Sequence, residues 1–301
     1  MNSTSLRVLT PAKVNLILRV LERRPDGFHA IWSLMHTVGL DDELILTMRP
    51  AAVSHIALRC DHAALAVDQT NLVYRAAQLV LARVDRAVDL SISLTKCIPM
   101  GAGLGGGSSD AAATILGLTR LLGLDWSAEQ MAEVGQELGS DVPFFFVAPA
   151  ACVTGRGEQV RPVQVTGSRW IVLVNPGFPV ETKWAYQQLS VTRSGVPPLS
   201  QALAQLGTRA ALDWSEIIPL VHNDFEVPVF AQHPVLAKMK RQLLDVGAEV
   251  ALLSGSGATM FGVFLDQASA ERAAAAFAHD QKMKAYAVPA AGAPVTNASE
   301  G

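Results

Sequence analysis

We predict an α+β protein with two domains from three features of the sequence. The chain has 301 residues, 50% of them hydrophobic, which is enough for two cores. Short strand-like runs dominate the first half, and a glycine-rich segment follows them directly before helical spacing. From about residue 165 the pattern changes to strands paired around helices, which is typical of an α+β sandwich.

Strands predominate before the glycine-rich segment, because short runs of apolar and β-branched residues recur there. Helical spacing follows over 71–84, and DLSISLT at 89–95 is an alternating strand that enters the glycine-rich segment. The earlier strand-like runs are RVLT at 7–10, VNLILRV at 14–20, AIWSLMHTV at 30–38, ELILTM at 43–48 and VSHIAL at 53–58.

Two helices are expected after the glycine-rich segment. Ser108 or Ser109 can cap the first of them, and WSAEQMAEVGQELG at 126–139 forms the second. The apolar face of the first helix consists of Ala112, Ile115, Leu116, Leu118 and Leu122.

The second half of the chain begins with the strand-like WIVLV at 170–174 and continues with several helical stretches. The elements after these are a strand pair, AEVALLSG at 248–255 and ATMFGVFL at 258–265, a helix around 268–278 and a final strand at 285–289.

The change of pattern also divides the chain. We expect an N-terminal domain over 1–164 and a C-terminal domain over 165–288. Residues 289–301 are small, polar and proline-containing, so we expect a flexible tail there.

The composition favours small-molecule partners. The formal net charge is -3 at pH 7, so no basic surface is evident for a nucleic-acid polymer or an anionic membrane. Cys60, Cys97 and Cys152 are too far apart in sequence to indicate a disulfide framework or a zinc site. The start MNSTSLRVL lacks the apolar core of a signal peptide, and no membrane-spanning stretch is evident, so we expect a cytoplasmic protein.

The glycine-rich segment PMGAGLGGGSSDAAAT at 99–114 matches several nucleotide-binding patterns only formally. Gly101, Gly103 and Gly106 fit G-x-G-x-x-G, with Asp125 as a candidate acid, but a dinucleotide-binding unit needs a parallel strand where a second helix follows here. The segment ends Gly-Ser-Ser and not in the Gly-Lys-Ser/Thr of a Walker A loop, and the protein-kinase motifs are missing.

A phosphate-binding loop is the interpretation that remains. Glycines let successive backbone N–H groups converge on an oxyanion, and the helix that follows presents unpaired amides and the positive end of its dipole. A flexible linker is a poor alternative, because the segment lies tightly between a strand and a helix.

The sequence resembles the GHMP kinases, the small-molecule kinases named for galactokinase and the homoserine, mevalonate and phosphomevalonate kinases. PMGAGLGGGSSDAA is similar to their nucleotide-binding motif, PAKVNL at 11–16 to their first motif and SGSGAT at 254–259 to their third. The resemblance runs from about residue 8 to about 285. It implies the GHMP kinase fold, a ribosomal S5 domain 2-like N-terminal domain with a ferredoxin-like C-terminal domain.

Further motifs resemble one branch of this family, which phosphorylates a cytidine diphosphate-linked methylerythritol in the non-mevalonate route to isoprenoids. The implied function is ATP-dependent phosphorylation of the 2-hydroxyl of that substrate, with Mg²⁺ offsetting the charge of the phosphates. The motifs are the triple glycine at 105–107, RPDGFH at 24–29, GSDVPFF at 139–145, GRGE at 155–158 and HNDFE at 222–226.

The resemblance also implies roles for single residues. Lys13 alone would be a solvated lysine at a strand end, but the first motif places its ammonium beside the transferring phosphoryl group. Asp141 alone would be a turn residue, but the family's catalytic aspartate, a general base, stands there against the apolar VPFFF. Asn15 should point to the same side of its strand as Lys13 and bind substrate.

Phe28 and His29 are implied to recognise cytosine, the ring by stacking and the histidine by hydrogen bonds. Without the resemblance they would be a buried aromatic and a surface histidine. The family usually has tyrosine where this chain has Phe28. Stacking survives that change, but any hydrogen bond from a phenol is lost.

The remaining motifs carry less chemistry. The loop at 254–259 is a hairpin turn that is implied to close the cleft from the other side, and GRGE and HNDFE are interpreted as architecture. The Mg²⁺ ligands, and any role of Asp110 among them, stay open. The phosphate-binding residues implied by the resemblance are Pro99, Met100, Gly101, Ala102, Gly103, Leu104, Gly105, Gly106, Gly107, Ser108 and Ser109.

Two alternative functions are weighed against this one. A sister GHMP kinase acting on homoserine or mevalonate is disfavoured by RPDGFH, since those substrates offer no cytosine to stack. A non-catalytic nucleotide-binding regulator on the same scaffold is disfavoured because the chain retains both Lys13 and Asp141.

Overall fold

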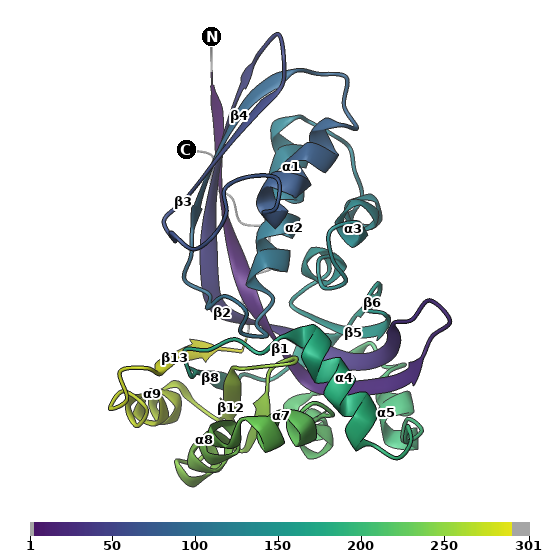
Figure 1. Ribbon diagram of the computed structural model, residues 1–301, viewed down its shortest axis with the longest axis vertical. Helices are drawn as coiled ribbons and strands as arrows, with labels where there is room; N and C mark the ends of the chain where they lie inside the picture. Colours follow the sequence, from purple (N-terminus) through teal and green to yellow (C-terminus); the bar gives the residue numbers. More distant parts are fainter. Residues whose placement is uncertain (1–2, 291–301) are drawn as a thin grey trace.

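Two sheets organise the chain in the computed structural model, which describes residues 3–290 (Figure 1). The larger sheet has seven strands, with the order β10-β1-β2-β4-β3 and with β5 and β6 extending from β2. Its strands are β1 (Thr4–Arg23), β2 (His29–Pro50), β3 (His55–Cys60), β4 (Val88–Thr95), β5 (Ala150–Gly155), β6 (Gln159–Pro162) and β10 (His222–Asn223).

The strands β1 and β2 are much longer than the runs predicted from the sequence. They pair antiparallel from Thr4↔Met48 to Arg23↔His29, with irregularities at Pro11/Ala12, Asn15/Ile17 and Val20/Arg23. The separate apolar runs are therefore parts of two continuous strands that bend at bulges. Figure 1 shows that both strands extend from the upper part of the larger sheet down to the C-terminal half of the chain.

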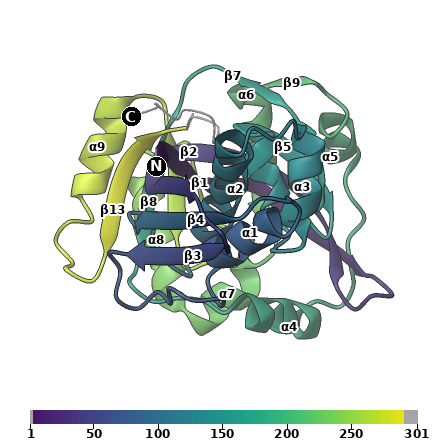
Figure 2. The same cartoon turned by 90° about the horizontal axis from the view of Figure 1, so that it is seen from above.

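The helices α1, α2 and α3 cover one face of the larger sheet (Figure 2). The predicted helices are confirmed as α1 (Leu72–Leu81), α2 (Gly106–Leu121) and α3 (Ala128–Gln136), and the short η1 (Pro143–Phe146) follows. Ser127 caps α3 in a capping box with Gln130.

The predicted serine cap of α2 is wrong. Gly105 is the N-cap, with φ +72°, and the helix begins at Gly106, so Ser108 and Ser109 lie inside its first turn. Glycine replaces a serine cap here because the chain enters the helix through a left-handed residue, which a side chain disfavours.

The smaller sheet has four strands in the order β11-β12-β8-β13, all antiparallel. It contains β8 (Trp170–Asn175), β11 (Val250–Leu253), β12 (Met260–Phe264) and β13 (Lys284–Pro289), with α8 (Pro234–Asp245) and α9 (Gln267–Ala275) packed against it. The expected strand pair, helix and final strand are confirmed.

Short elements connect the two sheets. They are β7 (Gln164–Thr166), α4 (Thr182–Thr192), α5 (Gln201–Leu206), β9 (Ala211–Asp213), α6 (Trp214–Ile217), η2 (Ile218–Leu220) and α7 (Glu226–Gln232). In Figure 1, α4 lies close to the lower ends of β1 and β2, and this region contains the candidate active site.

The two halves of the chain share their cores. One apolar cluster joins Val14 and Trp32 of the long strands to Leu173 and Phe261 of the smaller sheet. The strand β10 also pairs parallel with β1, through Ile17↔His222 and Leu18↔Asn223. The division at 164/165 stays a prediction, and residues 291–301 of the predicted tail lie outside the described residues.

No helix within residues 3–290 is long and apolar enough to cross a membrane.

Candidate active site

Lys13 lies in the middle of β1 with its side chain buried, and not at a solvated strand end. Its Nζ donates a hydrogen bond to Asn15 Oδ1 at 2.8 Å and lies 3.3 Å from Asp141 Oδ2. The Lys13 side chain is 5% exposed and that of Asp141 is 36% exposed. The structure therefore brings the three residues together. Within the ion pair, the carboxylate is more accessible to solvent than the ammonium.

Asn15 is held in a fixed orientation by a chain of hydrogen bonds. Its Nδ2 donates to Ser33 Oγ at 2.9 Å, and Ser33 Oγ donates to the carbonyl of Ile17 at 2.7 Å. Since the amide nitrogen is used this way, the Asn15 carbonyl oxygen faces Lys13. Both side chains lie on the same side of β1, as predicted.

The glycine loop, residues 99–109, packs directly on the part of β1 that carries Lys13. The Lys13 amide donates to the carbonyl of Leu104 at 2.9 Å. A Cβ on Gly105 would stand 2.9 Å from Lys13 Cγ, so any side chain there would displace the lysine. Glycine at this position thus allows the ammonium and the loop to approach each other closely.

The first turn of α2 faces a cavity of about 370 Å³, here called the loop cavity. The first backbone N–H groups of any helix have no carbonyl within that helix to bind. The Ser109 hydroxyl is buried and has no hydrogen-bond partner anywhere in the part of the chain that the structure describes. The unpaired amides and the positive dipole end of this turn suit a polyphosphate, whereas Ser109 itself is fully buried beneath the residues that line the cavity.

The loop at 254–259 packs against the glycine loop and is hydrogen-bonded to it. The Ser254 hydroxyl donates to the carbonyl of Gly103 at 3.0 Å, and the Thr259 amide donates to the carbonyl of Ala102 at 3.2 Å. Asn223 of β10, from the HNDFE motif, donates from Nδ2 to the carbonyls of Leu253 and Gly255. The HNDFE motif therefore holds the second loop in place.

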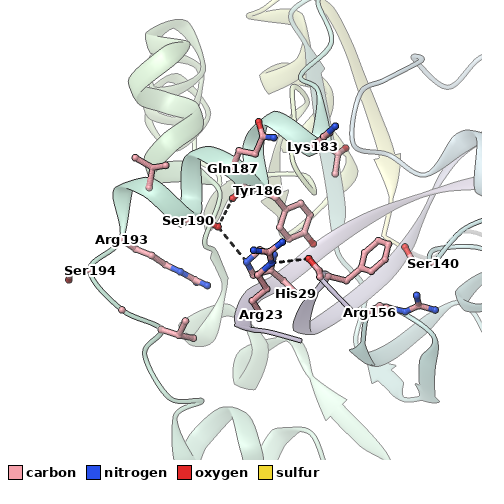
Figure 3. A pocket seen from close by; sticks show the side chains of 16 residues that line it. Arg23, His29, Ser140, Arg156, Lys183, Tyr186, Gln187, Ser190, Arg193 and Ser194 are labelled. Carbon is pink, nitrogen blue, oxygen red and sulfur yellow. Dashed lines mark hydrogen bonds between the residues drawn. The ribbon is translucent and has the colours of Figure 1, made fainter. Parts of the chain in front are cut away.

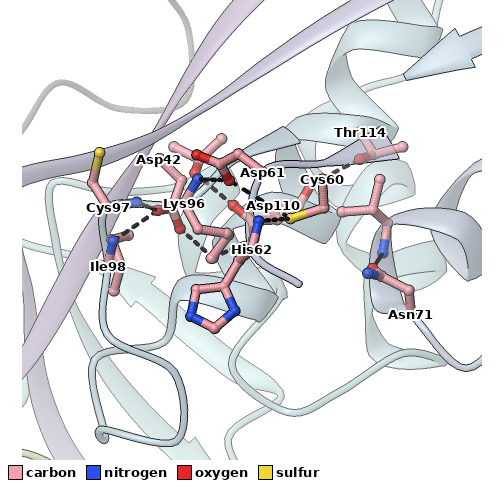
Figure 4. Close-up of polar contacts among 12 residues, drawn as sticks. Asp42, Cys60, Asp61, His62, Asn71, Lys96, Cys97, Ile98, Asp110 and Thr114 are labelled. Atoms are coloured by element: carbon pink, nitrogen blue, oxygen red, sulfur yellow. Dashed lines mark hydrogen bonds and ion pairs between the residues drawn. The ribbon is translucent and has the colours of Figure 1, made fainter. Parts of the chain in front are cut away.

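Asp110 is already engaged by protein groups. Its Oδ1 accepts a hydrogen bond from the Thr10 hydroxyl at 2.7 Å. Its Oδ2 accepts one from Lys96 Nζ, also at 2.7 Å (Figure 4). Across residues 3–290 no group of three histidine, cysteine, aspartate or glutamate side chains is arranged to hold a metal ion. Asp110 is thus part of a buried ionic cluster.

A second, larger cavity of about 1060 Å³ lies between the hairpin at 24–28 and α4 (Figure 3). We call it the large cavity. Phe28, which is 58% exposed, and His29 both line it, and so does Ser140, the neighbour of Asp141. The large cavity therefore extends from the predicted cytosine-binding pair to the residue that precedes Asp141.

His29 and Tyr186 form one wall of the large cavity. Their rings stack with centroids 5.3 Å apart, and Ser190 Oγ lies 3.4 Å from His29 Nε2. Burial, with the nearby Arg193 and Arg23, lowers the pKa of His29 and so favours its neutral form. A neutral imidazole can donate through one nitrogen and accept through the other, which suits recognition of a base.

Positive charge surrounds the large cavity. Arg23, Arg156, Lys183 and Arg193 all line it. The guanidinium of Arg156, from the GRGE motif, lies over the Phe28 ring at 5.1 Å from its centroid. This surrounding charge suits an anionic ligand that also carries an aromatic ring.

Sequence reasoning missed Tyr186 and Arg156. Burial, with the charge of Asp141 adding to it, raises the pKa of Tyr186 to about 12, so its phenol stays protonated. Tyr186 also packs edge-on against Phe225 of the HNDFE motif, at 4.8 Å between centroids. Within TKWAYQQLSVT a tyrosine looks like ordinary helix packing, and no local signal distinguishes it. Arg156 belongs to the GRGE motif, whose residues carry no local sign of chemistry.

A glycine loop at a helix N-terminus beside a lysine–aspartate ion pair defines a small-molecule kinase of the GHMP class. The family models agree with this class. The GHMP kinases N terminal domain matches residues 71–148, and the GHMP kinases C terminal domain matches residues 201–281.

Named relatives narrow the class. A 4-diphosphocytidyl-2-C-methyl-D-erythritol kinase of Syntrophotalea carbinolica is 40% identical over 93% of this chain and 97% of its own length. A crystal structure of 4-(cytidine 5'-diphospho)-2C-methyl-D-erythritol kinase matches 95% of this chain and 100% of that chain, with TM-score 0.76 and 32% identity. The chain belongs to the 4-diphosphocytidyl-2-C-methyl-D-erythritol kinase family of GHMP kinases.

A homoserine kinase from Cytophaga hutchinsonii has the same fold. The match covers 96% of each chain with TM-score 0.73, but the identity is 21%. This likeness concerns the fold alone.

Proposed function

We propose that the chain transfers the γ-phosphoryl group of ATP to the 2-hydroxyl of 4-diphosphocytidyl-2-C-methyl-D-erythritol, giving the 2-phosphate and ADP. The reaction belongs to the non-mevalonate isoprenoid pathway. The observation that carries this proposal is that the Lys13–Asp141 pair adjoins residues of two cavities: Gly105, which lines the loop cavity, packs on Lys13, and Ser140, which lines the large cavity, precedes Asp141. The loop cavity has a helix N-terminus suited to polyphosphate, and the large cavity has aromatic and cationic walls.

Asp141 is the proposed general base. Its accessible carboxylate accepts the proton of the 2-hydroxyl as the oxygen attacks phosphorus. The Lys13 ammonium fixes this carboxylate by the 3.3 Å ion pair and stabilises the negative charge of the transferring group. Asn15 holds Lys13 through its carbonyl oxygen, and its proposed contact with the substrate is with the acceptor alcohol.

ATP is the phosphate donor of this family, and the loop cavity fits its phosphates. The amides of Gly106, Gly107 and Ser108 in the first turn of α2 are proposed to bind oxyanions. Mg²⁺ would offset the phosphate charge. Because Asp110 is engaged by Lys96 and Thr10, the ion would be held mainly by the ATP phosphates, water and Ser108.

The cytidine end of the substrate is assigned to the large cavity. Phe28 offers a ring face to cytosine, and neutral His29, whose Nε2 contacts Ser190, offers its Nδ1 to the base edge. Arg23, Lys183 and Arg193 supply positive charge for the diphosphate. We also propose that the protein acts in the cytoplasm on this small molecule, and that its domains divide near residue 164.

An ADP-release assay over a panel of alcohols tests this function. The panel contains 4-diphosphocytidyl-2-C-methyl-D-erythritol, homoserine and mevalonate, each with ATP and Mg²⁺. We expect ADP release with the cytidine compound alone. Release with homoserine or mevalonate would assign a sister activity, and binding of ATP without release for any alcohol would favour a non-catalytic regulator.

A further inference from the structure

Three buried charged side chains lie beneath the glycine loop (Figure 4). Asp42 comes from β2, Lys96 directly follows β4, and Asp110 comes from α2. Their side chains are 0%, 4% and 3% exposed, respectively. Lys96 Nζ forms ion pairs with Asp42 Oδ2 and, at 2.7 Å, with Asp110 Oδ2. Two carboxylates therefore share a single ammonium, and the cluster is negative when both are ionised.

Asp42 connects this cluster to both ends of the glycine loop. Its Oδ1 accepts the amides of Cys97 at 2.5 Å and Ile98 at 2.8 Å, which lead into the loop. A Cβ on Gly106, the first residue of α2, would stand 3.3 Å from Asp42 Oδ2. The position of this carboxylate therefore affects both the entry of the loop and the start of the helix.

The cluster poses an electrostatic problem for a polyphosphate site. Buried carboxylates repel a bound anion more strongly than exposed ones, because little water screens them. Burial raises the pKa of Asp110 to about 7, with the charge of Lys96 opposing and that of Asp42 adding to the effect. Lys96 and Asp110 both line the loop cavity, so this charge lies next to the ligand.

We propose that Lys96 is a positioning residue of the nucleotide site, which neutralises Asp42 and Asp110 so that the glycine loop and the N-terminus of α2 can accept polyphosphate. Lys96 acts on the ligand through the field and the geometry of the two carboxylates. The inference rests on the proposed function, because it takes ATP as the ligand of the loop cavity.

The test measures equilibrium binding of AMP-PNP and of uncharged adenosine over a pH series that starts at 8 and extends well above it, because Asp110 is largely ionised at pH 8 only while Lys96 lowers its pKa. Lys96→Met keeps the length of the side chain and removes its charge, so at the high-pH end of the series, where Asp110 is ionised without Lys96, the dissociation constant of AMP-PNP should rise at least about tenfold. Adenosine binding should change less than about twofold, because it carries no charge for the carboxylates to repel.

Charge rescue separates this role from simple loss of structure. Asp110→Asn added to Lys96→Met should recover most of the lost AMP-PNP affinity, because it removes one of the repelling charges. Asp110→Asn alone should tighten AMP-PNP by about threefold or more, and this variant keeps the test valid if Lys96→Met does not fold. Lys284→Met, which removes an exposed lysine from β13, is the matched control and should bind AMP-PNP like the parent.

Several outcomes overturn the inference. Unchanged AMP-PNP affinity in Lys96→Met throughout the pH series removes the electrostatic role, and an equal loss of adenosine assigns Lys96 a direct contact with the nucleoside. Failure of Asp110→Asn to restore or tighten binding shows that the carboxylate does not repel the ligand. A parent protein that binds no AMP-PNP would instead contradict the proposed function.

Discussion

Each reacting group of the proposed site is held by a neighbour whose position the fold determines. Lys13 is fixed between Asn15 and Asp141, and Asn15 is fixed in turn by Ser33. Such support matters because catalytic groups must keep their geometry without the cost of reorganisation during the reaction. Single substitutions at these side chains should therefore distinguish effects on binding from effects on catalysis.

Asp141→Asn should keep ATP binding and lower kcat by about 10²–10⁴, the usual contribution of a positioned general base. Asparagine has nearly the same shape but cannot take the proton of the alcohol. Steady-state kinetics with the cytidine substrate, together with AMP-PNP titration, measure both quantities. Near-normal turnover in this variant would remove Asp141 from its proposed role.

Phe28→Ala should raise KM for the cytidine substrate about tenfold to a hundredfold, since stacking on a base contributes about 1–3 kcal/mol. Stacking on a remote base is the same in the ground and transition states, so kcat should stay within a few-fold of the parent. Substrate titrations of the parent, Phe28→Ala and Phe28→Tyr measure this.

Phe28→Tyr is the matched control for ring stacking, because it keeps the ring and adds only a hydroxyl. It should leave KM unchanged or slightly lower. An unchanged KM in the alanine variant, with circular dichroism confirming its fold, would mean that Phe28 does not contact the base.

The sequence predicted the residues with strong local patterns and missed those that depend on distant contacts. Lys13, Asn15 and Asp141 lie in short motifs, and the structure brings them together as expected. Tyr186 joins the site only because α4 packs beside the 24–28 hairpin, and residues 28 and 186 are far apart in the chain. The roles given to all these residues stay predictions until the variants are measured.

At the scale of elements, the site depends on two loops that fit against each other. Gly103 has φ +77°, and a Cβ there would stand 2.1 Å from the carbonyl oxygen of Ser254. Gly123, at the end of α2, has a similar φ of +66°, but a Cβ there would meet nothing within 4 Å. The two glycines thus share the same backbone strain and differ only in this contact.

Gly103→Ala should therefore lose much more affinity for AMP-PNP than Gly123→Ala. Both variants force alanine into a left-handed conformation, at a cost of about 1–2 kcal/mol. Only Gly103→Ala also separates the glycine loop from the loop at 254–259, so its dissociation constant for AMP-PNP should rise by more than about tenfold. Binding titrations and urea unfolding of both proteins make the comparison. Similar AMP-PNP affinities in the two variants would show that the contact between the loops is dispensable.

The predicted elements were mostly correct where a local periodicity identifies them. They were wrong where the backbone conformation of single residues determines where an element begins or continues. Helical spacing identified α1 and α3, but the serine cap of α2 was wrong because the left-handed Gly105 starts the helix. Bulges in β1 and β2 join runs that look separate in sequence. No periodicity rule signals that a strand continues through an irregularity.

At the scale of the whole molecule, His36 lies where the two halves of the chain meet. It is 5% exposed, its ring centroid lies 5.7 Å from that of Trp214, and its Nδ1 donates to the carbonyl of Thr37 at 2.6 Å. Burial lowers its pKa to about 4, with the hydrogen bond to Thr37 opposing that shift. The folded protein therefore holds His36 neutral at pH values where an unfolded chain protonates it.

Stability should fall as the pH falls from about 6.5 to about 4, because only the unfolded chain binds a proton at residue 36 in that range. The expected contribution is up to about 1.4 kcal/mol per pH unit. Urea unfolding followed by tryptophan fluorescence at several pH values measures the slope. His36→Phe should flatten it, and His279→Gln, at an exposed position, should leave it unchanged. Equal slopes in the parent and His36→Phe would contradict this assignment.

The pairing of β10 with β1 determines when the edge of β1 can be covered during synthesis. Both long strands leave the ribosome early, but the segment that covers the edge of β1 at Ile17 and Leu18 begins only at His222. At about 5–20 residues per second, this edge of the nascent sheet stays open for roughly 10–30 s after Pro50 is made. An uncovered edge can pair with a neighbouring nascent chain. This edge of the sheet is thus completed late in translation.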